Sequence, residues 1–407
     1  MYLKDRQYRK FCAYGFLKNL RFYEAFFILF LLNRGLSFTQ IGTLYAIRMI
    51  VTNLFELPSG IVADSFGRKR SLLTSFLLYI AAFMVFYLFR SFWLFVPAFV
   101  SIGIAEAFRS GTHKGMIMDY LSSKHWDEQA VDYYGHTRSW SQRGSALSAL
   151  LAGVIVLFGG NYELIFLASI LPYILNMLNV LSYPGYLDRS LKSRETKSLS
   201  QLMDPLKMLG QVLRDRKIRR IMHSSALHSA YLKAIKDYVQ LVMLNLALVL
   251  PLLTNQASEK RSALSIGVFY FLIYLASSWA SRNAARFSDK RPRMATATLL
   301  AGFLAGTLSG FLFHLELWGL ALLAFALIYI VENIRKPLLT GALAEVAPKE
   351  ILTSVISAQS LWHTILGSLM AVGFGLIADH RGIGPALMCV SGLLLVLSAA
   401  ISLPRSS

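Results

Sequence analysis

The stretch Gly60-Ile61-Val62-Ala63-Asp64-Ser65-Phe66-Gly67-Arg68-Lys69-Arg70 joins two long apolar runs, at about residues 38–62 and 71–89. Its three consecutive basic residues are typical of a loop on the cytoplasmic side of a membrane. Membrane orientation does not require the acidic Asp64, so we interpret this residue as functional. Gly67 suits a tight turn, because glycine adopts backbone conformations that other residues avoid.

The composition around this stretch is that of a membrane protein. Of the 407 residues, 55% are hydrophobic and only 15% are charged, and the mean hydropathy is +0.51. A soluble chain carries charge on roughly a quarter of its residues, so most of this surface must face something other than water. A spanning helix needs roughly 20 mainly apolar residues, and twelve such helices would use roughly 240.

Apolar segments of suitable length follow one another along the whole chain. The twelve segments lie at about 11–33, 38–62, 71–89, 92–121, 138–159, 162–184, 222–251, 262–281, 294–313, 315–345, 352–378 and 384–403. This pattern predicts an all-α polytopic membrane protein with twelve transmembrane helices.

Basic residues alternate with these segments in a consistent way. The formal net charge is +19, and Lys and Arg gather near the N-terminus and in the stretches 68–70, 122–137, 185–221 and 282–293. The connections on the other side carry few basic residues. The positive-inside rule explains this asymmetry better than nucleic-acid binding does. We therefore expect a lipid bilayer and no nucleic acid as partner, and both termini in the cytoplasm.

The basic segment 185–221 separates two groups of six predicted spans. We predict an N-terminal six-helix bundle at 1–184, a cytoplasmic linker at 185–221 and a C-terminal six-helix bundle at 222–407. Apolar residues of 199–213 recur at helical spacing, which indicates a short amphipathic helix along the membrane face.

The two halves repeat each other. Several short matches occur in the same order on corresponding segments, and they indicate a duplicated six-helix unit. The matching sets are 17–21 with 232–236, Glu106 and Arg109 with Glu332 and Arg335 at an offset of 226, and Asp64 with Asp289 at an offset of 225.

The stretch 60–70 resembles the signature Gly-x-Leu-Ala-Asp-Arg-x-Gly-Arg-Lys between helices two and three of the major facilitator superfamily. Val62 stands where that signature has Leu, and Ser65 where it has its first Arg. The resemblance covers the whole chain and implies two parallel halves with a solute site between them at mid-depth. It also implies a gate that alternates with the state of the protein. The predicted gating residues are Gly60, Asp64, Gly67, Arg68 and Asp289, with Gly60 allowing close helix packing.

A second signature of that family, Gly-Pro-x-x-Gly-Gly in helix five, marks many drug/proton antiporters. Segment five reads GSALSALLAGVIVLFGG at 144–160 and lacks the proline. This departure weakens an assignment as a drug antiporter without excluding it.

Ionisable residues inside spans are costly and usually functional. Here they concentrate on the first, fourth, seventh and tenth segments, which line the central cavity in the family that the chain resembles. Cations exceed acids along these segments, and a water-filled cavity with surplus positive charge favours an anion. Arg21 offers a fork that suits carboxylate or phosphate. The predicted solute-binding residues are Lys18, Arg21, Tyr23, Glu24, Arg109, Lys233, Lys236, Tyr238 and Arg335.

The sequence also allows a purely structural role for several of these charged residues. Glu106 with Arg109 forms an i, i+3 pair that can satisfy itself, and the same holds for the pair in segment ten. Lys18 and Lys233 lie nearer the cytoplasm and can extend their ammonium groups to the interface.

Carboxyl groups among apolar helices can carry a proton near neutral pH. The predicted proton-coupling residues are Glu106, Glu332 and Asp237, and Glu24 is a further candidate. Four histidines also lie in spans, and we interpret each as a packed polar residue more readily than as a proton relay. They are His113, His223, His228 and His363.

No catalytic motif of the Gly-x-Ser-x-Gly, Walker A or HExxH type is present, so we expect neither an enzyme nor a cofactor. Cys12 and Cys389 show no metal-binding spacing. We predict a monomeric secondary transporter of the bacterial cytoplasmic (inner) membrane that moves a small organic anion by alternating access, with proton symport or antiport. The alternatives are multidrug or metabolite efflux by proton antiport, and flipping of a lipid-like substrate.

Overall fold

The structure is a computed structural model that describes residues 5–126, 129–188, 216–250, 258–283, 291–346 and 352–401. Within these ranges the secondary structure is helical, with no strand. The same ranges contain nine helices that are long and apolar enough to cross a membrane. The predicted all-α membrane fold is confirmed, whereas the count of twelve spans stays a prediction. Asp289 and most of the predicted linker, 189–215, lie outside the described residues.

The three predicted spans that are not among the nine have visible reasons. Segments 11–33 and 222–251 are each interrupted by a 3-10 turn, at Phe22–Ala25 (η1) and Lys236–Tyr238 (η5). The third, at 384–403, contains a shorter apolar helix, Ile383–Ser398.

Contacts group the chain into two units. Unit 1 contains residues 1–30, 50–197 and 255–271, and unit 2 contains 31–49, 198–254 and 272–407. The boundary therefore falls inside three helices, α2 (Phe27–Asn33), α3 (Phe38–Phe66) and α12 (Ser258–Asn283). The predicted division into halves at 185–221 stays a prediction.

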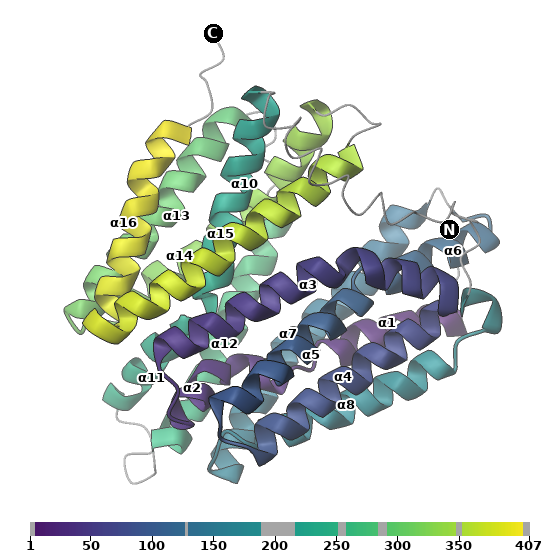
Figure 1. The fold of residues 1–407 in the computed structure, drawn as a ribbon, viewed down its shortest axis with the longest axis horizontal. Coiled ribbons are helices and arrows are strands. Elements are labelled where there is room, and N and C mark those ends of the chain that lie inside the picture. The colour runs from purple at the N-terminus through teal and green to yellow at the C-terminus, as the bar shows by residue number, and fades with distance from the viewer. Residues whose placement is uncertain are drawn as a thin grey trace. The chain divides into compact units, whose positions relative to one another are not determined.

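Unit 1 is a bundle in which α4 packs against α5 and α8, and α1 packs against α7 and α8. Figure 1 shows α4 and α8 running side by side. The elements that lie wholly in this unit are α1 (Arg6–Lys18), η1, α4 (Arg68–Leu88), α5 (Phe92–Arg109), α6 (Thr112–Ser123), α7 (Ala130–Gly159), α8 (Leu164–Leu181) and η3 (Gly185–Asp188).

Aromatic rings fill the interior of unit 1. Phe166 of α8 lies with its ring centroid 4.5 Å from that of Phe30 and 5.1 Å from that of Phe86. Phe27 stacks on Phe99 at 5.3 Å. Such ring pairs contribute about 0.5–1.5 kcal/mol each beyond simple burial, so they fix how α2, α4, α5 and α8 pack.

Unit 2 is built around α13, which packs against α14 and α16, while α10 packs against α14 and α15. Figure 1 shows α13 and α16 side by side. The elements that lie wholly in this unit are α10 (Arg216–Ile235), η5, α11 (Val239–Val249), α13 (Arg291–His314), α14 (Trp318–Val346), α15 (Leu352–Arg381) and α16 (Ile383–Ile401).

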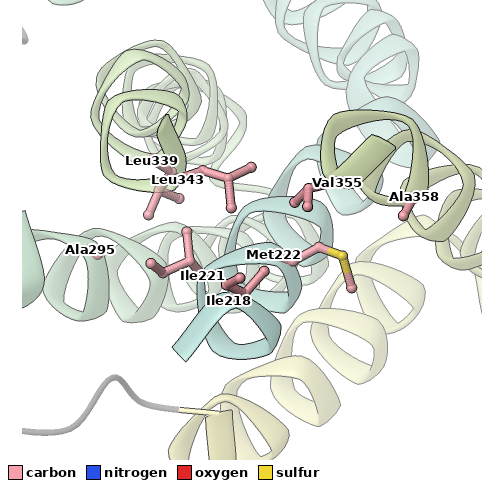
Figure 2. Close-up of a cluster of buried hydrophobic side chains, with 8 residues drawn as sticks. All are labelled: Ile218, Ile221, Met222, Ala295, Leu339, Leu343, Val355 and Ala358. Carbon is pink, nitrogen blue, oxygen red and sulfur yellow. The ribbon is translucent and has the colours of Figure 1, made fainter. Parts of the chain in front are cut away.

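One end of unit 2 is closed by a cluster of small and branched apolar side chains (Figure 2). The members come from α10, α13, α14 and α15, and they are Ile218, Ile221, Met222, Ala295, Leu339, Leu343, Val355 and Ala358. The cluster holds these four helices together at the end where α10 begins.

Glycines bring two helix pairs into very close contact. In unit 2, a Cβ added to Gly42 of α3 or to Gly375 of α15 would overlap the backbone of the other helix. In unit 1, a Cβ added to Gly153 of α7 would lie 2.7 Å from the carbonyl oxygen of Ala263 in α12. Such small residues allow helix backbones to approach closely in a membrane.

Candidate functional site

The helices that carry the predicted solute-binding charges are broken where those charges lie. Helix α1 ends at Lys18, and Arg21 caps the 3-10 turn η1. In unit 2, α10 ends at Ile235, and η5 contains Lys236 and Asp237. Discontinuous helices are a recurrent feature of solute sites in membrane proteins, because they free backbone groups and helix ends.

Unit 1 contains a cavity of about 580 Å³ beside the first of these breaks. It is lined by parts of α1, α3, α5, α6 and α7, together with the short connection between α5 and α6. The cavity brings together three of the predicted residues, Lys18, Glu106 and Arg109. It adds Lys114 and Arg138, so four basic side chains line it against one acidic side chain.

Arg109 is the most informative side chain of this cavity. Its guanidinium carbon lies 5.3 Å from the ring centre of Tyr79, a cation–π contact. Its Nη1 atom is buried and has no hydrogen-bond acceptor among the described residues. A buried donor on a charged group costs at least about 1–3 kcal/mol when it is left unpaired.

Three tyrosine hydroxyls near Arg109 are likewise buried without a hydrogen-bond partner among the described residues. Tyr14, Tyr79 and Tyr173 lie close enough to Arg109 to interact electrostatically, and the rings of Tyr79 and Tyr173 are 5.0 Å apart. Unit 1 therefore holds four buried polar groups around one point, and every one of them can donate a hydrogen bond.

Lys18 is positioned by a stack of rings. The rings of Tyr14 and His113 stack at 3.5 Å with an interplanar angle of 5°. His113 Nε2 lies 3.1 Å from the Tyr183 hydroxyl, and the Lys18 ammonium lies 5.8 Å from the centre of the Tyr14 ring. His113 is thus a packed residue that supports the cavity wall.

The break between α5 and α6 opens a helix N-terminus into the cavity. Gly111, which has a φ of 74°, starts α6 without a side-chain cap. Gly111, His113 and Lys114 of this first turn all line the cavity. The N-terminus of a helix attracts negative charge, because its first amides have no partner within the helix.

The other predicted residues of the first segment lie outside this lining. Arg21 donates its Nε–H to the carbonyl of Lys18 at 3.4 Å, and its guanidinium lies 3.7 Å from the Glu24 carboxylate. Tyr23 is buried against Phe83 and Phe166. These three residues stabilise the break at η1, and a direct contact with solute stays a prediction.

In unit 2, both terminal nitrogens of the Arg335 guanidinium are held by neighbours, while its buried Nε has no hydrogen-bond partner among the described residues. Its Nη1 donates to the Ala295 carbonyl and to Thr298 Oγ1 at 3.0 Å. Its Nη2 donates to the carbonyl and the hydroxyl of Ser224, at 2.8 and 2.9 Å. Arg335 therefore ties α14 to α13 and α10, although it occupies the place of Arg109 in the sequence repeat.

Glu332 is paired with a histidine. His228 Nδ1 lies 2.7 Å from Glu332 Oε2, and the Ser229 hydroxyl donates to Glu332 Oε1. The i, i+3 pairing of Glu332 with Arg335 that the sequence left open is not formed, because each side chain is bound to other helices. In unit 1, Glu106 accepts a hydrogen bond from Thr52 at 3.3 Å.

The remaining predicted residues of unit 2 lie around η5. The Lys236 ammonium is 3.6 Å from the Asp237 carboxylate, and the Tyr329 hydroxyl donates to the Lys236 carbonyl at 2.8 Å. Tyr238 is buried, with its ring 4.4 Å from that of Phe374. Lys233 lies in the last turn of α10. Their contact with solute stays a prediction.

The gating stretch forms an ion-pair network in unit 1. Arg68 Nη1 contacts Asp119 Oδ2 at 2.6 Å, and Arg68 Nε lies 4.0 Å from Asp64. Gly67 has a φ of 102°, and the backbone amide of Lys69 donates to Asp188 at 2.7 Å. The close packing expected of Gly60 is absent, since a Cβ there would meet no atom of the described residues within 4 Å.

A carboxylate caps the N-terminal end of α3, within unit 2. Asp379 of α15 accepts hydrogen bonds from the backbone amides of Phe38 and Thr39, at 2.7 and 2.9 Å. This cap joins α3 and α15 next to the glycine contact at Gly42 and Gly375.

We expect Asp379→Ala to loosen this α3–α15 contact by about 0.5–2 kcal/mol, the usual cost of replacing a helix N-cap by alanine. Hydrogen exchange of peptides that cover Phe38 and Thr39 should become faster in this variant. Glu316→Gln, at an exposed residue between α13 and α14, is the matched control and should leave the exchange unchanged. Unchanged exchange in Asp379→Ala would show that the cap does not hold α3.

The fold and the charged cavity inside a helical membrane bundle define a transport protein. The sequence profile of the Major Facilitator Superfamily matches residues 20–371, and the chain belongs to this family. It is an integral, multi-pass membrane protein and a secondary transporter rather than an enzyme. The major facilitator fold predicted from the stretch 60–70 is thereby confirmed.

The chain is similar to other transporters in sequence or in fold, and these similarities do not identify its solute. A 30% identical stretch of 90 residues is shared with the uncharacterised MFS-type transporter YxaM of Bacillus subtilis (strain 168), covering 22% of this chain and only 23% of that protein. A substituted form of the nucleoside transporter NupG matches with a TM-score of 0.78 at 14% identity, covering 97% of this chain and 98% of NupG. A bacterial homologue of the human lysosomal transporter Spinster, inward-facing and occupied, matches with a TM-score of 0.71 at 13% identity, covering 99% and 97%.

Sequence reasoning missed three features of the site. Lys114 and Arg138 were visible as charges in segments four and five, but only the fold shows that they line the cavity. The pairing of His228 with Glu332 had no signal beyond a histidine inside a span.

Proposed function

We propose that the chain moves a small organic anion and that the unit 1 cavity binds its negative group. The observation that carries this proposal is the cluster of unpaired buried donors around Arg109, formed by its own Nη1 and the hydroxyls of Tyr14, Tyr79 and Tyr173. Arg109 and Tyr14 line the cavity itself. A carboxylate or phosphate offers only acceptors, so it satisfies several of these donors at once. A cation offers no acceptor to the Arg109 Nη1 and is repelled by the guanidinium charge.

Two further features support an anion. Lys18, Lys114 and Arg138 add positive charge to a cavity whose acidic lining residue is Glu106. The uncapped N-terminus of α6 points partial positive charge at the same space. A fixed positive field in a largely apolar bundle raises the local concentration of anions and repels cations. The cavity volume of about 580 Å³ is in the range that accommodates a small organic molecule.

The wider mechanism is alternating access by a monomer in the bacterial inner membrane, with both termini in the cytoplasm and with proton coupling. Asp64, Arg68 and Asp119 would form the gate on the side of the Gly67 loop, and Asp379 a latch at the other end of α3. Both contacts are carboxylate bonds to a cation or a helix end, which can exchange partners at modest cost.

A thermal-shift screen of the purified full chain tests the anion proposal. The compounds should come in matched sets that share one carbon skeleton and carry a carboxylate, a neutral amide or an amine. We expect only carboxylates, or the related phosphates, to raise the unfolding temperature. A set in which the amine stabilises the protein more than the carboxylate would overturn the proposal and favour efflux of cations.

A further inference from the structure

The deepest titratable pair of unit 2 is formed by His228 of α10 and Glu332 of α14. Their side chains are 0% and 12% exposed, and Nδ1 of the histidine lies 2.7 Å from Oε2 of the carboxylate. The other carboxylate oxygen accepts a hydrogen bond from the Ser229 hydroxyl. Both oxygens of Glu332 are thus held, one of them by a group that can itself gain or lose a proton.

The far side of the His228 ring is closed. Its Nε2 atom is buried and has no hydrogen-bond partner in the described part of the chain. A Cβ added to Gly302 of α13 would overlap the ring, which also lies 5.7 Å from the ring of Phe303. No group of the described residues on that side accepts a hydrogen bond from an imidazolium, so Glu332 is the partner against which the histidine can hold a positive charge.

The charged groups around the pair include one permanent cation, Arg335, which lies within electrostatic range of both His228 and Glu332. From α14, Arg335 is already bound to Ser224, Thr298 and the Ala295 carbonyl. From α15, His363 hydrogen-bonds the backbone at Ser229 and lies within electrostatic range of Glu332. The charges of Lys233 of α10 and Lys336 of α14 lie within electrostatic range of His363.

We infer that His228 and Glu332 bind one proton as a single site and that this site is the proton-coupling site of the transporter. The inference rests on the proposed function insofar as transport is proton-coupled. With the proton bound to the Glu332 carboxyl, which then donates to His228 Nδ1, the pair is neutral overall. Without it, the pair carries one negative charge.

This difference is what coupling requires. The deprotonated carboxylate is attracted to the nearby charge of Arg335, whereas the protonated one is not, so protonation changes the balance between conformations that keep or lose this attraction. The proton comes from water on one side, is shared between Nδ1 and Oε2, and leaves to water on the other side. The other predicted carriers are less suited, because Asp237 contacts the permanent cation Lys236 and Glu106 lines the anion cavity.

Infrared difference spectroscopy of the purified full chain across a pH titration tests this inference. We expect the wild type to show a reversible protonated-carboxyl band that Glu332→Gln removes. His228→Gln should keep the band and move its midpoint by about one pH unit or more, because a hydrogen bond to a charged group contributes about 1.5–3 kcal/mol. Glu56→Gln, at an exposed carboxylate on α3, is the control and should leave the band unchanged.

A band that survives in Glu332→Gln, or a midpoint that does not respond to His228→Gln, would overturn the inference. Ser229→Ala provides a second probe if either variant fails to fold, since it removes only one hydroxyl donor. Its band should also shift in midpoint, and an unshifted band in Ser229→Ala would count against the site.

The same samples separate this inference from the anion proposal. Glu332→Gln should keep the thermal shift given by an anionic compound, because that compound binds at Arg109. If no anion stabilises the wild type while the Glu332 band still titrates, the anion proposal fails and the proton site stands. If anions bind normally and Glu332 shows no titration, the reverse holds.

Discussion

Arg109→Gln should lower the affinity for the transported anion about 30-fold to several thousand-fold, which corresponds to about 2–5 kcal/mol. The guanidinium supplies the buried Nη1 donor and the charge at the centre of the donor cluster. Glutamine keeps a polar side chain, although a shorter one, and removes the charge. Isothermal titration with the strongest anionic compound from the thermal-shift screen measures the change. Arg109→Lys should restore only part of the affinity, since an ammonium group lacks the planar fork.

Arg143→Gln is the matched control for this experiment. Arg143 lies on α7, directly after the cavity-lining Gln142, but it is exposed, contacts the ring of Trp140 at 4.7 Å and does not line the cavity. Its loss should leave the affinity within about twofold, as expected for a screened surface charge. Equal affinities in wild type and Arg109→Gln would show that Arg109 is structural and that the anion binds elsewhere.

Arg335→Ala should instead lower the free energy of unfolding by about 3–5 kcal/mol. The change would remove four hydrogen bonds, since the Ala295 and Ser224 carbonyls and the hydroxyls of Thr298 and Ser224 all now accept from Arg335. The Thr298 hydroxyl would keep its own bond to the Ala295 carbonyl, at 3.3 Å. It would also leave a cavity between α10, α13 and α14. The thermal unfolding midpoint in detergent should fall by several degrees, and Arg335→Lys should rescue little because one ammonium cannot reach all four acceptors.

Arg109→Gln serves as the control for this prediction, because it changes the same residue type at the equivalent position of the repeat. It should change the unfolding midpoint far less, since the Arg109 Nη1 has no acceptor to lose among the described residues. If Arg335→Ala unfolds at the wild-type temperature but loses anion binding, the roles of the two arginines are reversed.

The helical membrane fold could be predicted because it depends on properties that are local in the sequence. Runs of about 20 apolar residues report burial in lipid, and the stretch 60–70 carries the family signature. The helix breaks at η1 and η5 were missed because hydropathy averages over a window. Arg21, Glu24, Lys236 and Asp237 mark the breaks in hindsight, since charged groups favour a place where backbone amides and carbonyls are freed.

The difference between Arg109 and Arg335 could not be predicted. Both follow a glutamate by three residues on corresponding segments, so their local sequences predict the same pairing. What separates them lies on other helices, since α13 and α10 offer acceptors to Arg335 while tyrosines face Arg109. The same reasoning applies to Glu332, whose partner His228 lies 104 residues earlier in the chain.

Exchange of a labelled anion across proteoliposomes that contain the purified chain tests the central claim most directly. Vesicles are loaded with the strongest anionic compound from the screen, and the labelled form is added outside. We predict rapid exchange with the wild type and with Arg143→Gln, and almost none with folded Arg109→Gln. Exchange by Arg109→Gln at the wild-type rate, or faster exchange of the amine of the same skeleton than of the carboxylate, would contradict the account.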